Sequence, residues 1–144
     1  MELQDCIDFA NANPVCFIAT VDGDQPRVRG VLMMSADESG FSYALLSPKQ
    51  VSKQLKANPK MEVVYYNNPA NLGEARQMRV TGTAELVRDP ALIKKVAQDR
   101  AFLEQICGQP IEPLVEIWRV SHGDAHFWTM MDVLKEPQLE HIKF

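Results

Sequence analysis

The chain has 144 residues, of which 46% are hydrophobic and 24% are charged, and its formal net charge is −4. This composition excludes a disordered chain, and the length suits one folded domain over residues 1–144. No apolar run approaches the ~20 residues that a membrane span needs, and the acidic balance argues against nucleic-acid binding.

The first half of the chain predicts a helix, a hairpin and a third strand. Apolar residues at helical spacing indicate a helix over residues 2–12, which Asn13-Pro14 ends. The stretch VCFIATV (15–21) reads as a strand, and Asp22-Gly23 predicts a hairpin into a second strand from Arg27 to Met34. A turn at ADESG precedes a strand over 41–46, and a helix with a row of lysines follows over 48–57.

The second half predicts four more strands and a longer helix. We expect strands over 61–67 and 76–87, the second bent at Gly82. Asp89-Pro90 predicts a helix that runs to about Ile106 and ends at Gly108. Strands over 114–120 and 125–131 follow, joined by a tight turn through His122-Gly123-Asp124. The polar tail from Leu134 is expected to be peripheral. Six or seven short strands with three helices predict a mainly β fold, a small antiparallel β-barrel with peripheral α-helices.

Cysteine and histidine spacing predicts neither disulfides nor a metal site. The three cysteines, Cys6, Cys16 and Cys107, are odd in number and far apart, so we interpret them as small buried residues of a cytoplasmic protein. His122 and His126 flank a turn and have no evident third ligand.

Positive charge gathers at one strand and one helix start, although the chain as a whole is acidic. Arg27 and Arg29 are two apart and so share a strand face, while Lys49, Lys53, Lys56 and Lys60 follow along one side of the helix region. Ser47 can cap this helix and Pro48 suits its first position, which leaves free backbone N–H groups for an anion. The pattern indicates a phosphate site, but it fits a solvated helix face with ordinary edge-strand arginines equally well.

The order of these segments resembles the pyridoxamine 5′-phosphate oxidase-like proteins with the FMN-binding split-barrel fold. The resemblance rests on PVCFIATVDGDQPRVRGVLMM, a strand ending in Ser-Pro-Lys, KQLKANPKMEVVYY and RQMRVTGTAELV, and it covers about Asp8 to Trp128. It is strongest to the short bacterial members. It implies FMN at the interface of a homodimer, in sites shared between the two subunits.

The resemblance also assigns cofactor-binding residues. It implies that the flavin and its phosphate are lined by the Arg-x-Val-Leu segment, by the end of the third strand with the loop after it, and by the Lys-Gln pair of the helix. It further implies that a Gln and a Trp reach FMN from the partner subunit. Together with Arg27 these residues are Arg29, Gly30, Val31, Leu32, Leu45, Leu46, Ser47, Lys49, Lys53, Gln54, Gln77 and Trp128.

Two departures separate the chain from the true oxidases. Lys49-Gln50-Val51 stands where the oxidases carry a Ser-Arg-Lys phosphate motif, and the residues after Trp128 contain no Arg-Leu-His-Asp-Arg segment, which holds the vitamin substrate. We therefore expect an FMN-dependent oxidoreductase with another small-molecule redox substrate. Two alternatives remain: a flavin-binding or stress-associated module without turnover, and a relative that uses deazaflavin or haem, with His122, His126 or His141 as the haem ligand.

A homodimer is also indicated by the number of apolar strand residues, which exceeds what one small barrel can bury. The residues concerned are Met33, Met34, Tyr65, Tyr66, Met78 and Trp118.

Overall fold

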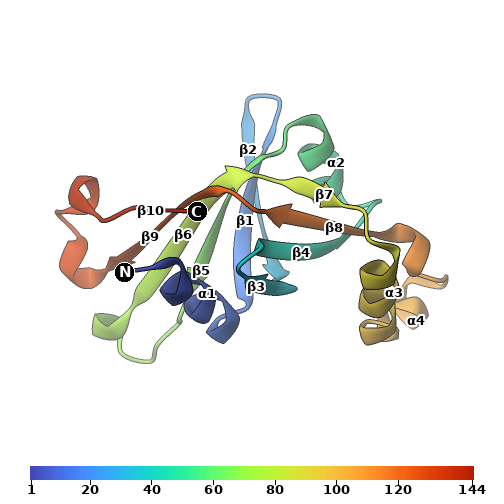
Figure 1. Ribbon diagram of the computed structural model, residues 1–144, viewed down its shortest axis with the longest axis horizontal. Coiled ribbons are helices and arrows are strands. Elements are labelled where there is room, and N and C mark those ends of the chain that lie inside the picture. The colour runs from blue at the N-terminus through green and yellow to red at the C-terminus, as the bar shows by residue number, and fades with distance from the viewer.

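The computed structural model describes residues 1–144 and contains two antiparallel sheets (Figure 1). The six-stranded sheet has the order β10-β9-β6-β5-β1-β2, with bounds β1 (Val15–Asp22), β2 (Gln25–Leu32), β5 (Lys60–Tyr66), β6 (Arg76–Thr83), β9 (Gly123–Thr129) and β10 (Ile142–Lys143). The four-stranded sheet has the order β3-β4-β8-β7, with bounds β3 (Ser35–Asp37), β4 (Gly40–Leu46), β7 (Glu85–Val87) and β8 (Val115–Val120).

Four α-helices lie outside the sheets: α1 (Leu3–Ala12), α2 (Gln50–Ala57), α3 (Pro90–Asp99) and α4 (Phe102–Cys107). Short 3₁₀ helices cover Leu72–Glu74, Glu112–Leu114, Met130–Asp132 and Glu136–Gln138. None of the helices combines the length and the apolar character that a membrane span requires. The mainly β architecture with peripheral helices is the predicted one.

Local sequence signals explain two of the element boundaries. Asp22 pairs with Gln25, so the first hairpin turns through Gly23 and Asp24, one residue later than the Asp-Gly dipeptide suggests. Gly23 has a φ of +65°, which a residue with a side chain rarely adopts. Asp89 caps α3 as predicted, because its side chain accepts hydrogen bonds from the backbone N–H groups of Ala91 and Leu92.

The predicted helix after Asp89 is two helices. Arg100 leaves the helical conformation at the end of α3, and its guanidinium donates a hydrogen bond to the backbone oxygen of Ala44 on β4 at 3.0 Å. The chain resumes as α4 and ends at Gly108, which is left-handed with a φ of +69°. The predicted stop at Gly108 is therefore confirmed.

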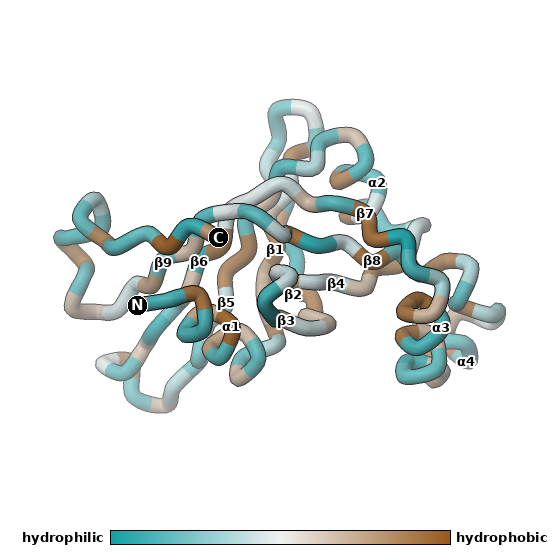
Figure 2. The backbone as a smooth tube through the Cα atoms, viewed as in Figure 1, coloured by the Kyte–Doolittle hydropathy of each residue, from teal (hydrophilic) through white to brown (hydrophobic).

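The core lies between the two sheets. The face of the six-stranded sheet that carries Ile18, Val63 and Val80, here called the inner face, packs against Phe41 and Tyr43 of the four-stranded sheet. Figure 2 shows the matching hydrophobic stretches along β1 and β5. The opposite face of the same sheet, here called the outer face, carries Phe17, Gly30, Val64 and Arg79, because residues paired directly across strands point to the same side.

One chain buries most of the apolar residues that we expected a dimer to cover. Met33, Tyr65, Met78 and Trp118 are all at most 4% exposed within the single chain. That part of the sequence argument is wrong, because these side chains pack into the core of a single chain. The exposed apolar strand residues are different ones and lie on the outer face: Val15, Phe17, Val28 and Leu32.

The two sheets are joined where neighbouring strands change sheet together. The predicted strand over 76–87 breaks at Ala84 into β6 and β7, which belong to different sheets, and β8 and β9 likewise do not pair with each other. At this corner Gly82 pairs with Gly123. A Cβ on Gly82 would lie 2.4 Å from Cγ1 of Val120 and 2.9 Å from the backbone oxygen of His122. Strand β6 continues through Gly82 and breaks two residues later, at Ala84, whereas Gly82 itself is required by the close approach of Val120 and His122. The tight turn at His122 connects two sheets instead of forming a hairpin.

The tail is not peripheral at its end. Strand β10 pairs with β9, and the ring of Phe144 packs edge-on against Phe41 at 5.3 Å between centroids. The sequence does not indicate this return, because residues 134–138 are exposed and only the last residues pair with the sheet.

We predict that Gly82→Ala lowers the free energy of unfolding by about 1–3 kcal/mol, because the added methyl group has no space at the corner between the sheets. Gly73→Ala is the control: its Cβ would meet only the side chain of Asn71, at 3.3 Å. Denaturant unfolding of both variants measures the difference. Equal stability of the two would show that the corner tolerates a side chain.

Candidate functional site

Arg29 lies on the inner face of β2, half-buried between the β1–β2 hairpin and α2. Its Nη1 donates hydrogen bonds to the backbone oxygen of Ile18 at 3.3 Å and to Oγ1 of Thr20 at 2.7 Å. Its Nη2 donates to Oε1 of Gln54 at 2.5 Å. These three acceptors are all neutral, and no carboxylate oxygen lies within 4 Å of the guanidinium. Arg29 therefore carries a positive charge that the chain itself does not pair.

The partners of Arg29 hold it in place. Thr20 and Gln54 are 2% and 8% exposed, and the Thr20 hydroxyl donates to Oε1 of Gln54 at 2.6 Å. Burial, and then the neighbouring charge of Arg27, lower the pKa of Arg29 below its ordinary value of 12.5. An arginine remains charged at neutral pH, so its surroundings favour an anion at this position.

Helix α2, which carries Gln54, starts at Gln50, two residues later than predicted. Its N-cap is Lys49, which makes no side-chain capping bond. Ser47 does not cap the helix: its backbone N–H donates to the backbone oxygen of Leu114 at 2.8 Å. The backbone N–H groups of the first three helical residues, Gln50 to Ser52, have no acceptor within the protein. Val51 and Ser52 are buried, so the N–H group of the exposed Gln50 is the one open to an external acceptor.

The four lysines do not share one side of the helix. Lys60 belongs to β5, and Lys56 is paired with Glu116 at 2.7 Å. Lys49 and Lys53 have no carboxylate within 4 Å, and they join Arg29 as unpaired cations of this region. Arg27 is exposed and paired with Asp22 at 3.3 Å. Of the predicted basic residues, Arg29, Lys49 and Lys53 are thus the ones without a carboxylate partner.

A polar depression of about 400 Å³ opens between the hairpin tip and α2. Its lining combines the hairpin turn with one side of the helix: Val21, Asp22, Gly23, Gln50, Lys53, Gln54, Ala57 and Asn58. Lys53 and Gln54 are therefore placed together by the structure, at the wall next to Arg29.

Other predicted residues lie on the outer face, across the sheet from Arg29. Gln77 on β6 pairs with Trp128 on β9, and both are half-buried. Gly30 and Leu32 point to the same side from β2. A second depression of about 400 Å³ on this face is lined by Phe17, Ala19, Val28, Glu62, Val64, Gln77 and Arg79. One chain therefore does not bring Gln77 and Trp128 to the Arg29 site.

Three more predicted residues, Leu45, Leu46 and Val31, pack wholly or partly into hydrophobic core clusters. Leu45 is 5% exposed in the main core, and Leu46 packs with Ile117 in a smaller cluster near α3. Val31 packs against the main core from β2. For Leu45, only the backbone could reach a ligand.

Sequence reasoning missed Thr20 as a member of the site, although the hairpin register contains the signal. Pairing of Asp22 with Gln25 places Thr20 opposite Arg27 and therefore diagonal to Arg29 on the same face.

The prediction of buried cysteines is wrong for Cys107, which is exposed at the end of α4, whereas Cys6 and Cys16 are buried as predicted. Burial raises the pKa of Cys6 to about 11 and that of Cys16 to about 12, so neither thiol is ionised at neutral pH.

Comparison with known proteins identifies relatives of the sequence. The sequence model of the pyridoxamine 5′-phosphate oxidase family matches residues 3–128. The pyridoxine/pyridoxamine 5′-phosphate oxidase of Rhodopseudomonas palustris is 38% identical over 73 residues, which is 50% of this chain and 32% of that protein. The match thus spans about a third of the length of this curated relative.

Solved structures share the split-barrel fold at low sequence identity. A NimC/NimA family protein from Clostridium acetobutylicum has a TM-score of 0.74 and 19% identity, covering 99% of this chain and 92% of that one. General Stress Protein 26 from Bacillus anthracis has a TM-score of 0.70 and 13% identity, covering all of both chains. HutZ, a haem storage protein from Vibrio cholerae, has a TM-score of 0.63 and 16% identity, covering 90% of this chain and 95% of that one.

Proposed function

The chain belongs to the pyridoxamine 5′-phosphate oxidase family, and from this premise we propose that it binds FMN and acts as a flavin-dependent oxidoreductase. We propose a homodimer in which each FMN site is built from both subunits. We also propose one domain over residues 1–144, since a single core cluster draws on both sheets, and a cytoplasmic location, since the cysteines form no disulfide.

The observation that carries the proposal is the unpaired charge of Arg29. A half-buried guanidinium with only neutral acceptors is incompletely compensated, and a phosphate would supply the missing anionic partner. Lys49 and Lys53 have no carboxylate partner either, and the backbone N–H of Gln50 has no acceptor within the protein. These groups also favour an anion. The residues present therefore fit a phosphate-bearing cofactor.

In this proposal Arg29, Lys49 and Lys53 hold the phosphate of FMN, and Thr20 and Gln54 fix the orientation of Arg29. The isoalloxazine supplies the redox chemistry when FMN is bound, so the protein needs no dedicated acid or base. Substrate selection must differ from that of the vitamin oxidases, because the chain lacks their Arg-Leu-His-Asp-Arg segment. We propose another small-molecule redox substrate.

The division of the predicted residues between two sheet faces supports a shared site. Gln77 and Trp128 lie on the outer face, together with Val15, Phe17, Val28 and Leu32, which are 60%, 45%, 69% and 54% exposed. An apolar patch of this kind on one sheet face is typical of an interface. In this proposal a second copy of the chain covers the patch, and Gln77 and Trp128 contribute to a cofactor site that one chain leaves incomplete.

Turnover distinguishes an oxidoreductase from a flavin-binding or stress-associated module. An enzyme should be reduced by NADH or NADPH and reoxidised by an acceptor, whereas a passive binder should show neither step. The absorption spectrum separates FMN from deazaflavin and from haem.

We predict that Arg29→Ala weakens FMN binding by about one to two decades, because one charge-assisted contact is worth roughly 1.5–3 kcal/mol. Lys53→Ala should act in the same direction. Lys60→Ala is the matched control, since Lys60 lies on β5 outside the unpaired cluster. Fluorescence titration with FMN and with riboflavin, which has no phosphate, measures both effects. Equal affinity for the two flavins would refute a phosphate site at Arg29.

We predict that mixing Arg29→Ala with Trp128→Ala restores flavin binding. In a shared site the mixed dimer has one site with both damaged residues and one with neither, so some flavin should be regained. Refolding the variants together and measuring bound flavin tests this. If both residues served one site within a single chain, no flavin would be regained, and a folded, flavin-loaded monomer in light scattering would exclude the shared site.

A further inference from the structure

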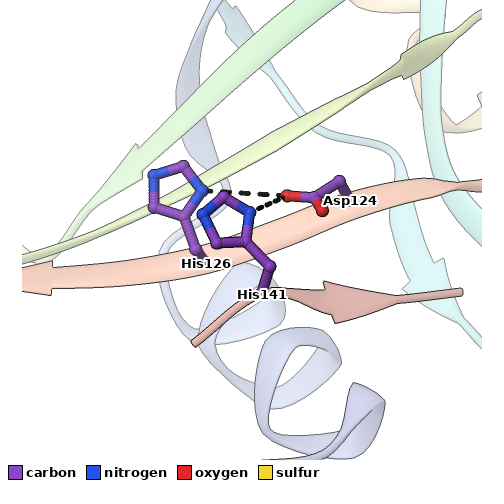
Figure 3. Close-up of side chains that lie close together, drawn as sticks. All are labelled: Asp124, His126 and His141. Carbon is purple, nitrogen blue, oxygen red and sulfur yellow. Dashed lines mark hydrogen bonds and ion pairs between the residues drawn. The ribbon is translucent and has the colours of Figure 1, made fainter. Parts of the chain in front are cut away.

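Asp124, His126 and His141 lie together on the outer face near the end of the chain (Figure 3). Oδ1 of Asp124 is 2.5 Å from Nδ1 of His141 and 4.0 Å from Nδ1 of His126. The two imidazole rings lie side by side, with centroids 4.6 Å apart and planes inclined by 30°. One ligand atom of each of the three residues lies within 4.8 Å of the other two.

The strand register explains why these residues meet. Asp124 and His126 are two apart on β9 and so share a face. Strand β10 is antiparallel to β9, with Lys143 opposite Asp124 and Ile142 opposite Ala125. Continuing this register brings His141 beside His126. The spacing of His122 and His126 in the sequence gives no hint of this, because the second histidine comes from the tail.

His126 is the unusual member of the cluster. Its residue is only 8% exposed, and its Nδ1 is buried without a hydrogen-bond partner. Burial is the largest cause that lowers its pKa, followed by the charges of His141 and Arg79. A buried nitrogen lone pair or N–H without a partner costs free energy, and this nitrogen points toward Asp124, as Figure 3 shows.

The charges around the cluster leave Asp124 available. Lys143 lies 2.5 Å from Oδ2 of Asp124, which leaves Oδ1 directed at the two histidines. Arg79 is opposite His126 on β6, but it is paired with Glu62 and Glu136. Arg79 is thus paired with other carboxylates, whereas the exposed Lys143 is paired with Asp124 itself, through Oδ2.

We propose that Asp124, His126 and His141 bind a divalent transition-metal cation of the zinc class, with one coordination position left for water or an external ligand. Two imidazoles and one carboxylate are a ligand set found in such sites. A tetrahedral ion with bonds of about 2.0–2.1 Å needs its ligand atoms about 3.3 Å apart. The three side chains therefore need only small rotations. The ion would replace the hydrogen bond between Asp124 and His141 and would satisfy Nδ1 of His126.

The bound ion would also fasten the end of the chain to the sheet. His141 precedes β10, and Asp124 and His126 belong to β9, so one ion would bridge the two strands. Binding to the folded state alone would raise thermal stability in proportion to the logarithm of the metal concentration.

The test is calorimetric titration of untagged full-length protein with Zn²⁺, after treatment with a chelator and its removal. We expect one Zn²⁺ per chain and a higher unfolding temperature when the site is saturated. His141→Ala and Asp124→Asn should lower the affinity at least about 100-fold, which is the upper range for loss of a residue that merely supports a ligand. Both variants replace partly exposed side chains, so their circular dichroism should match that of the parent protein.

His122→Ala is the control, because His122 is exposed and outside the cluster. It should bind Zn²⁺ like the parent, and flavin content should be the same in all three variants, which separates this test from that of the Arg29 site. The proposal is overturned if the parent does not bind Zn²⁺ stoichiometrically, or if His141→Ala binds it as well as the parent. It is equally overturned if haemin binds in a His141-dependent manner and Zn²⁺ does not, since the cluster would then be a haem site.

Discussion

The unpaired positive charge of Arg29 is the constraint on which the proposed function depends. The β1–β2 hairpin places Thr20 beside it, and the packing of α2 against β1 adds Gln54. Two buried neutral side chains therefore fix the direction of a charge that has no counterion in the chain. Such an arrangement holds a cation ready for an anion, at the cost of leaving it incompletely compensated until the anion arrives. Helix α2, which supplies Gln54, begins with Gln50, whose backbone N–H has no acceptor within the protein.

The two faces of the six-stranded sheet have different roles. The inner face forms the core and carries Arg29 toward α2, whereas the outer face combines exposed apolar residues on β1 and β2 with polar and ionic ones on β6, β9 and β10. The residues that the family resemblance assigns to one cofactor are divided between these faces. A single chain cannot join them, since a sheet lies between. This division is a physical reason to consider a site completed by a second copy.

Local signals predicted the parts of the fold that short-range chemistry controls. Gly23 fixed the hairpin, Asp89-Pro90 began α3 and Gly108 ended α4, each through backbone geometry or a capping bond. Contacts between distant segments were not predictable in this way. The change of sheet at Ala84 and the break at Arg100 depend on tertiary packing, and so does the burial of Met33 and Trp118. The same limit applies to side-chain clusters: charge spacing could single out Arg29 and Lys53 as candidates, whereas the meeting of Asp124 with His141 required the return of the tail to β9.

The most direct test of the central claim is to identify the small molecule that the purified protein releases on denaturation. The account predicts FMN by mass, with a stoichiometry approaching one per chain, from protein expressed without added cofactor. Release of haem or of a deazaflavin would contradict the assignment of the Arg29 site to FMN. A protein that releases no flavin and takes up none on incubation with FMN would contradict it equally.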